Sequence, residues 1–273
     1  MKLEDLLTTN TLIPSLPEAV ALILVELQQD EPDMRTVNAR LASELGLTVR
    51  ILRLVNSAHF AAGDRRVGSV EAATALLGLK ATQQLVRTAA VGAAFRKVSG
   101  VDLTGFWRHS LDVAKIAEAL AEELALDTSE AFTAGLLHGT GDLILKMAMP
   151  QRPSLQREFA TDDHRHAAQL ADLGYSYAEV GAAFASRWRF PLPIVDAIRH
   201  HCDPQDTGGD TLASVVFLAA WTARAHELDI CGTALFDQFP HTVANAIGLT
   251  DSALLCSDEV IEWTRPDEAR DFS

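Results

Sequence analysis

Apolar residues at helical spacing constrain this chain more than any other feature of its sequence. Side chains that recur at intervals of three and four residues fall on one face of an α-helix. Such sets occur along the whole chain, for example in residues 20–27, 111–124 and 212–225. No segment has the strict alternation that is typical of a half-buried strand. The sequence therefore predicts an all-α fold with short connections.

Cap and turn residues divide this helical pattern into separate elements. Ser69 is a good N-cap for a helix that Gly78 ends, and Ser99-Gly100 is the best candidate for a boundary between lobes. We therefore expect an N-terminal helical lobe over residues 1–98. A second helical lobe, with a C-terminal helical extension, is expected over residues 99–273.

The charge and composition of the chain exclude several classes of protein. It has 37 acidic and 23 basic residues and a net charge of −14, and no segment concentrates Lys and Arg. Direct binding to nucleic acid is therefore not expected. The longest uncharged apolar window, residues 212–221, is far shorter than the roughly 20 residues that span a bilayer. We expect no membrane insertion.

The N-terminus and the cysteines bear on the cellular compartment. The first residues, MKLEDLLTTN, lack the basic stretch and apolar run of a signal peptide. The cysteines, Cys202, Cys231 and Cys256, are widely spaced and form no CxxC pair. This spacing is typical of reduced thiols. The sequence therefore predicts a cytoplasmic protein.

The stretch FTAGLLHGTGDLILKM, residues 132–147, combines a helical apolar pattern with glycines that interrupt it. Each glycine inside a helix costs about 1 kcal/mol relative to alanine. Gly139 and Gly141 therefore predict a bend, a close backbone approach or the floor of a pocket. His138 lies at this break, which gives it the strongest functional case among the histidines.

The histidines nonetheless have ordinary structural explanations. His109 lies on a helix with an apolar face, where a histidine is more often a hydrogen-bonded core residue than a ligand. His200 and His201 lie at a helix end, where they can bond the last carbonyls and interact with the helix dipole. For His138 we favour a structural imidazole that is bonded to His109 or Asp142.

Other polar and aromatic candidates point to no enzyme class. The sequence has no P-loop, GxGxxG, CxxC or nucleophile-elbow motif. His164 and His166 fall in a charged loop and are expected at the surface. Trp107, Trp188 and Trp221 lie beside apolar neighbours at helical spacing, so we expect them to anchor the core or the contact between lobes.

Six short motifs follow one another along the chain in a specific order and spacing. Together, over roughly residues 12–222, they resemble the HDOD family, whose name means HD-related output domain. This resemblance implies a bacterial signalling module with an N-terminal helical lobe and a C-terminal lobe shaped like an HD hydrolase. Members are usually regarded as regulatory. The motifs are LPE (16–18), LRLVNSA (52–58), SVEAA (69–73) leading to LGL (77–79), FWRHS (106–110), AGLLH (134–138) and IRHH (198–201).

The resemblance also indicates which residues of an HD metal shell are retained. That shell combines an early His, a His-Asp pair, later histidines and a final Asp. His109 and His138 stand at the first two histidine positions. His200 or His201 stands at a later one.

Departures from the HD pattern outnumber these agreements. Gly139 replaces the paired Asp, Tyr177 stands where a His is expected, and Ala220 lies near the position of the final Asp. Asp142 replaces a Lys that could meet a phosphate, and an anion there repels a phosphate. We therefore expect no metal, no cofactor and no catalytic residue. The residues expected to line this remnant pocket are His109, His138, Asp142, Tyr177, His200 and His201.

The resemblance therefore leads us to expect a non-catalytic bacterial signalling module that acts as a scaffold for signalling proteins, linked to two-component or cyclic di-GMP signalling. Its function would then lie in a surface or a groove between the lobes. One alternative is a metal-dependent phosphohydrolase of cyclic dinucleotides or nucleotides, and another is a nucleotide-binding sensor without hydrolysis. The sequence does not identify the partner, the input signal or the oligomeric state.

Overall fold

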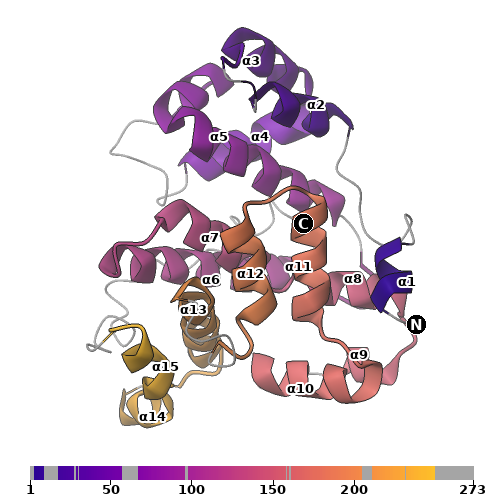
Figure 1. Ribbon diagram of the computed structural model, residues 1–273, viewed down its shortest axis with the longest axis vertical. Coiled ribbons are helices and arrows are strands. Elements are labelled where there is room, and N and C mark those ends of the chain that lie inside the picture. The colour runs from indigo at the N-terminus through magenta and orange to yellow at the C-terminus, as the bar shows by residue number, and fades with distance from the viewer. Residues whose placement is uncertain are drawn as a thin grey trace. The chain divides into compact units, whose positions relative to one another are not determined.

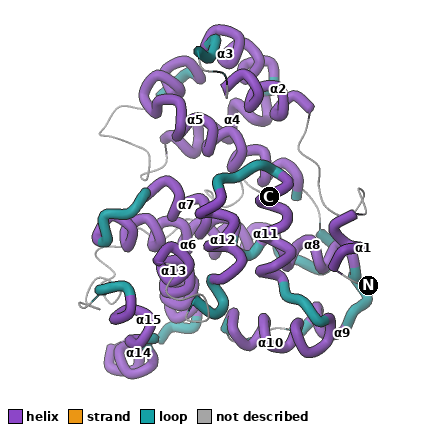
Figure 2. The backbone as a smooth tube through the Cα atoms, in the orientation of Figure 1, coloured by secondary structure: helices purple, strands orange, loops and turns teal. Residues whose placement is uncertain are grey.

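The computed structural model describes residues 3–8, 18–27, 29, 31–56, 67–95, 98–157, 159, 161–204, 211–230 and 232–249. Every regular element in these ranges is a helix, which confirms the all-α prediction (Figure 2). The chain divides into two compact units. The larger unit comprises Met1–Ile13 and Val98–Ala269, and the smaller unit comprises Pro14–Lys97 and Arg270–Ser273.

The smaller unit contains four described helices. They are α2 (Glu18–Leu27), α3 (Met34–Ser43), α4 (Leu45–Asn56) and α5 (Val70–Ala94). Ser69 caps α5 as predicted, because its hydroxyl accepts a hydrogen bond from the Ala72 amide at 3.2 Å. Gly78 has a φ of 73° and breaks the helical path inside α5, so the predicted stop is a kink.

The larger unit is built around one long helix and two helices that pack against it. α6 (Leu103–Glu123) packs closely against α7 (Thr128–Leu137), and α13 (Thr211–Glu227) packs on the other side of α6 (Figure 1). The core between α6 and α13 is apolar and includes Val113, Ile116 and Leu218. Burial of this surface is the main favourable contribution to the folding of the unit.

The larger unit contains eight further helices in the residues that the structure describes. They are α1 (Leu3–Thr8), α8 (Thr140–Ala148), α9 (Pro153–Gln156), α10 (Asp162–Leu173), α11 (Tyr177–Arg187), α12 (Leu192–His200), α14 (Gly232–Gln238) and α15 (His241–Ala246). α1 contacts α11, and its Leu6 side chain is fully buried. The first residues therefore belong to the larger unit, which differs from the expected lobe over residues 1–98.

Several expectations concern buried side chains. Trp107 and Trp188 are fully buried, which confirms their predicted role in the core. Trp221 is only partly buried and lines a pocket. Cys202 is a buried free thiol, whereas Cys231 and Cys256 lie outside the described residues. Across the helices that are described, none is both long and apolar enough to traverse a bilayer.

The glycines of the 132–147 stretch produce a bend and a close backbone approach, two of the outcomes that the sequence predicted. α7 ends at Leu137 and α8 begins at Thr140, so His138 and Gly139 form a bend between two helices. Gly141 allows a close backbone approach of α8 to α11. A Cβ atom added at Gly141 would lie 1.9 Å from the Tyr177 carbonyl oxygen and 2.6 Å from the Gly181 nitrogen.

The crossing of α8 and α11 leads to a test by substitution. We expect Gly141→Ala to lower the free energy of unfolding by about 3 kcal/mol, because the added methyl group meets backbone atoms that cannot move alone. Alanine's helix propensity offsets only about 1 kcal/mol of this. Urea unfolding monitored by circular dichroism measures the change.

Gly139→Ala is the matched control for this substitution. Its added Cβ atom would lie 3.1 Å from the ring of Phe106, a side chain that can shift. We therefore expect a loss below about 1 kcal/mol. Equal losses for the two variants would contradict the close backbone approach at Gly141.

Candidate functional site

Three buried or half-buried imidazoles converge in the larger unit. His109 lies on α6, His138 lies in the bend between α7 and α8, and His201 is the C-cap of α12. The ring centroids of His109 and His138 are 5.7 Å apart, and those of His138 and His201 are 5.4 Å apart. We call these three side chains the imidazole cluster. Of the two candidates at the end of α12, His201 joins the cluster and the partly exposed His200 does not.

Backbone hydrogen bonds orient two of the rings. The Nδ1–H group of His138 donates to the Gly135 carbonyl at 2.6 Å, and that of His201 donates to the Ile198 carbonyl at 2.7 Å. A carbonyl can only accept, so Nε2 of each neutral ring is the acceptor. Burial lowers the pKa of His138 to about 3 and that of His201 to about 4, although Asp162 opposes both shifts. Both rings are therefore neutral near pH 7.

Tyr177 occupies the remaining ring nitrogen of His201. Its hydroxyl lies 3.0 Å from Nε2 of His201 and donates to it, while the Cys202 thiol donates to the same hydroxyl at 3.2 Å. Burial raises the pKa of Tyr177 well above its usual range, so the phenol keeps its proton. The residue that replaces an expected histidine thus satisfies the nitrogen of another histidine.

Asp162, at the start of α10, is the residue of the site that the sequence analysis missed. Its Oδ2 atom lies 3.7 Å from Nε2 of His138. Among the described residues neither atom has a hydrogen-bond partner, and both atoms are buried. Burial alone would raise the pKa of Asp162, but the charge of Arg165 leads the effects that hold it well below its usual range. An ionised carboxylate therefore faces an unprotonated ring nitrogen.

His109 is bonded away from the other two rings. Its Nδ1 atom lies 3.0 Å from Oε1 of Glu227 at the end of α13, and Arg224 pairs with the same carboxylate at 2.8 Å. Burial would raise the pKa of Glu227, but the hydrogen bond with His109 and the pair with Arg224 lower it to about 2. The prediction that His138 bonds His109 or Asp142 is wrong, because its Nδ1–H group donates to the Gly135 carbonyl.

Asp142 belongs to a separate polar network. Its carboxylate pairs with Lys146 at 2.9 Å and Arg165 at 3.6 Å, and it accepts a hydrogen bond from Gln169 at 3.1 Å. Gln169 in turn accepts from the Tyr177 amide at 2.7 Å. The negative charge that was expected to repel a phosphate is thus compensated by two cations. His166, expected at the surface, is partly buried on α10, whereas His164 is exposed as predicted.

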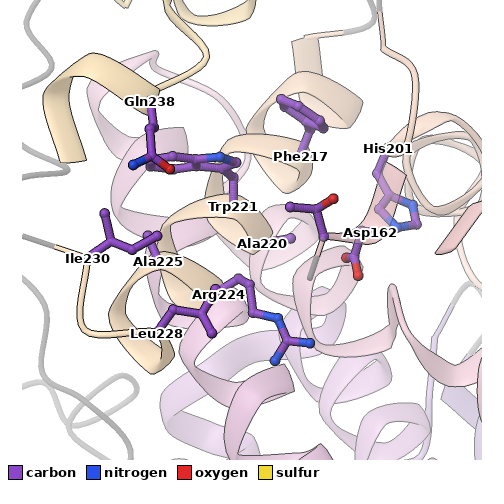
Figure 3. A pocket seen from close by; sticks show the side chains of 11 residues that line it. Asp162, His201, Phe217, Ala220, Trp221, Arg224, Ala225, Leu228, Ile230 and Gln238 are labelled. Carbon is purple, nitrogen blue, oxygen red and sulfur yellow. The ribbon is translucent and has the colours of Figure 1, made fainter. Parts of the chain in front are cut away.

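Two cavities adjoin the imidazole cluster and share Thr161, Asp162 and Arg224 in their walls. The apolar pocket has a volume of about 160 Å³, and Figure 3 shows Arg224 reaching from its apolar side toward the side of Asp162 and His201. The polar cavity has a volume of about 330 Å³. The apolar pocket is lined by Thr161, Asp162, His201, Phe217, Ala220, Trp221, Arg224, Ala225, Leu228, Ile230 and Gln238. The polar cavity is lined by Gly100, Asp142, Lys146, Ser154, Leu155, Gln156, Arg157, Phe159, Thr161, Asp162, Arg165, Gln169 and Arg224.

The donor set of the imidazole cluster does not fit a catalytic metal. Tyr177 holds Nε2 of His201, whereas the bond from Nδ1 of His109 to Glu227 leaves Nε2 of that ring open. In the part of the chain that the structure describes, no three His, Cys, Asp or Glu side chains are arranged to hold a metal ion. A hydrolytic metal site requires at least three such protein ligands and an open position.

Comparisons with solved structures extend over almost the whole chain. A protein of Shewanella amazonensis, which carries the provisional name of a phosphohydrolase, is 26% identical, with a TM-score of 0.77 over 98% of each chain. MmoQ, a response regulator of Methylococcus capsulatus, is also 26% identical. Its TM-score is 0.51 over 90% of this chain and 100% of that one.

Sequence relatives match smaller parts of longer proteins. An uncharacterized protein of Treponema pallidum is 26% identical over 195 residues, which are 69% of this chain and 37% of that protein. Ribonuclease Y of Thermus thermophilus is 35% identical over 113 residues, which are 41% of this chain and 15% of the enzyme. The chain thus spans well under two thirds of either relative.

A family model also matches most of the chain. The model of the HDOD domain matches residues 13–204, which include the imidazole cluster, Tyr177 and Asp162. It also includes the ordered motifs on which the resemblance rested. The chain belongs to the HDOD family.

Proposed function

We propose that this HDOD protein is a non-catalytic signal-transduction module that acts as a scaffold for signalling proteins. Membership of the HDOD family and the likeness to the response regulator MmoQ support a signalling module. The hydrogen bond from the Tyr177 hydroxyl to Nε2 of His201 is the observation that carries the non-catalytic part. This hydrogen bond occupies a ring nitrogen that a metal of the HD type would need as a ligand.

The remaining donors are too few for phosphoryl chemistry. Among the described residues, Nε2 of His138 and Oδ2 of Asp162 are buried without a hydrogen-bond partner and lie 3.7 Å apart. A two-metal site needs carboxylates that bridge and clamp both ions. Nε2 of His138, Nε2 of His109 and one carboxylate oxygen do not supply the carboxylate bridges of that shell, so we propose that the cluster is structural.

The partner surface and the compartment follow from charge and cysteine usage. The net charge of −14 favours partners with a neutral or basic surface. We place the protein in the cytoplasm, where thiols such as the buried Cys202 stay reduced. Ribonuclease Y matches over only 15% of its length, so we propose no nuclease activity for this chain.

Metal analysis tests the non-catalytic part of this proposal. After incubation with Fe²⁺, Mn²⁺ or Zn²⁺ and gel filtration, we expect substoichiometric metal by mass spectrometry and no hydrolysis of cyclic dinucleotides or nucleotides. The physical reason is that Tyr177 already occupies the acceptor nitrogen of His201, and the open nitrogens of His109 and His138 have only one carboxylate oxygen, from Asp162, beside them. Stoichiometric metal that is lost in His138→Ala but kept in the exposed His164→Ala, together with turnover, would overturn it.

Affinity capture tests the scaffold part. We expect the full-length chain, used as bait in a lysate of its native host, to retain a two-component or cyclic di-GMP signalling protein in a near-stoichiometric amount. Purified partner and bait should then form a complex that weakens at high salt, since an acidic surface contributes to it. Failure of the two purified proteins to associate at micromolar concentration would argue against a scaffold.

The structural role of the imidazole cluster predicts a pH dependence of stability. The pKa values of His138 and His201 are lowered in the folded state to about 3 and about 4. Below the unfolded value of about 6.5 the unfolded chain therefore binds protons that the folded chain does not, and stability falls as the pH falls. We expect each ring to cost about 2 kcal/mol of unfolding free energy from about pH 7 to pH 5.

Variants isolate this contribution from other titrating groups. The pKa of Glu118 is raised to about 8, mainly by burial, so its contribution has the opposite sign and weakens stability as the pH rises. The difference between the wild type and a variant removes the contribution of Glu118, because all of these proteins share it. His138→Gln should lose about 2 kcal/mol less than the wild type between these pH values, whereas the exposed His164→Gln should follow the wild type. Urea unfolding at both pH values gives the difference, and identical losses for all three proteins would refute the assignment.

A further inference from the structure

The polar cavity of the larger unit is lined by more cations than anions, although the chain as a whole is acidic. Lys146, Arg157, Arg165 and Arg224 line it against the two carboxylates of Asp142 and Asp162. Arg224 also pairs with Glu227 outside the lining at 2.8 Å, which leaves a net excess of one positive charge, that of Arg157. Its volume of about 330 Å³ greatly exceeds the ~10–15 Å³ that one water needs. In a chain with a net charge of −14, such a lining favours a small anion.

The two carboxylates of the cavity are already neutralised by the wall itself. Oδ2 of Asp142 pairs with Lys146 at 2.9 Å and with Arg165 at 3.6 Å, and its Oδ1 accepts from Gln169. Oδ1 of Asp162 pairs with Arg165. These contacts fix the positions of the cations. A preorganised set of donors binds an anion without the entropy cost of ordering long side chains.

Several donors along the wall remain available to a ligand. Nε of Arg165 is buried and has no hydrogen-bond partner among the described residues. Arg157 is exposed, and its guanidinium lies 5.4 Å from the centroid of the Phe159 ring. The Lys146 ammonium has three protons, of which its pair with Asp142 uses one. Each group can donate a charge-assisted hydrogen bond to an oxyanion.

The start of α10 adds uncharged donors to the same wall. Thr161 is the N-cap of this 12-residue helix, yet its side chain makes no capping bond and its hydroxyl is buried without a partner. The side chain of Asp162, the first helical residue, turns to Arg165 and His138 instead of capping the helix. Uncapped amides at a helix N-terminus carry a partial positive charge and suit phosphate-like groups.

We propose that the polar cavity is a binding site for a small oxyanion of the phosphate type, either free or as the terminal group of a larger metabolite. Arg157, Lys146, the Thr161 hydroxyl and the first amides of α10 hold it. This site is separate from the imidazole cluster and does not depend on the scaffold role. It gives the module a small-molecule input. The input reaches the cluster through Arg165, whose guanidinium lies 4.2 Å from the centroid of the Tyr177 ring.

Calorimetric titration with inorganic phosphate tests the site in the full-length protein. The titration is made at about pH 7.5, where a phosphate group is largely dianionic, and at constant ionic strength set with chloride. We expect saturable binding with one site per chain. Arg157→Glu should weaken the affinity for phosphate by about tenfold or more, because it replaces one attractive charge by a repulsive one.

Arg199→Glu is the matched control, since Arg199 is also exposed and the substitution changes the net charge equally. It lies on α12 and does not line the polar cavity. We expect its affinity for phosphate to stay within about twofold of the wild type. Equal weakening by the two variants would show a general effect of charge and overturn the site.

Amide chemical shifts provide a second measurement that does not depend on heat release. With phosphate, we expect the largest changes at Thr161, Asp162 and Arg165, with smaller changes at the imidazole cluster. Saturation with a common dissociation constant for these signals would support the proposal. Absence of saturable changes in the folded protein, or changes scattered over the surface, would overturn it.

Discussion

The close backbone approach of α8 to α11 is the contact on which the larger unit depends. With glycine at position 141, the Tyr177 carbonyl lies where any side chain would otherwise stand. This proximity brings the start of α11 beside the bend that carries His138. From there Tyr177 meets His201 through its hydroxyl and Gln169 through its amide. One short interhelical distance thus sets the geometry of both the imidazole cluster and the polar network.

The polar residues of this region form two groups, one of neutral rings and one of paired charges. His138 and His201 are buried and neutral, with their Nδ1 protons directed to backbone carbonyls of their own helices. The network of Asp142, Asp162 and Arg165 is charged, and each member has an opposite charge within ion-pair distance. Buried charges are tolerated only when they are paired in this way. Asp162 connects the two groups, since it pairs with Arg165 and faces His138.

The fold could be predicted from the sequence largely because helical periodicity, caps and glycines act locally. Ser69, Gly78 and the bend at His138 were all apparent from neighbouring residues. The partners in the site depend on contacts between residues distant in sequence. Asp162 follows a polar stretch and resembles a surface residue, and only the packing of α10 brings its carboxylate to His138. Likewise, nothing in the sequence around Glu227 indicates that it meets His109, 118 positions away.

The bend at Gly139 has a consequence for what could be built at this site. A Cβ atom there would lie 3.1 Å from the Phe106 ring, so an aspartate at this position would fit only if that ring moved aside. Even then, an incoming ion would have to displace the Tyr177 phenol from His201. A metal shell of the HD type at this place would therefore need both the ring of Phe106 and the phenol of Tyr177 to give way, one for steric and one for chemical reasons.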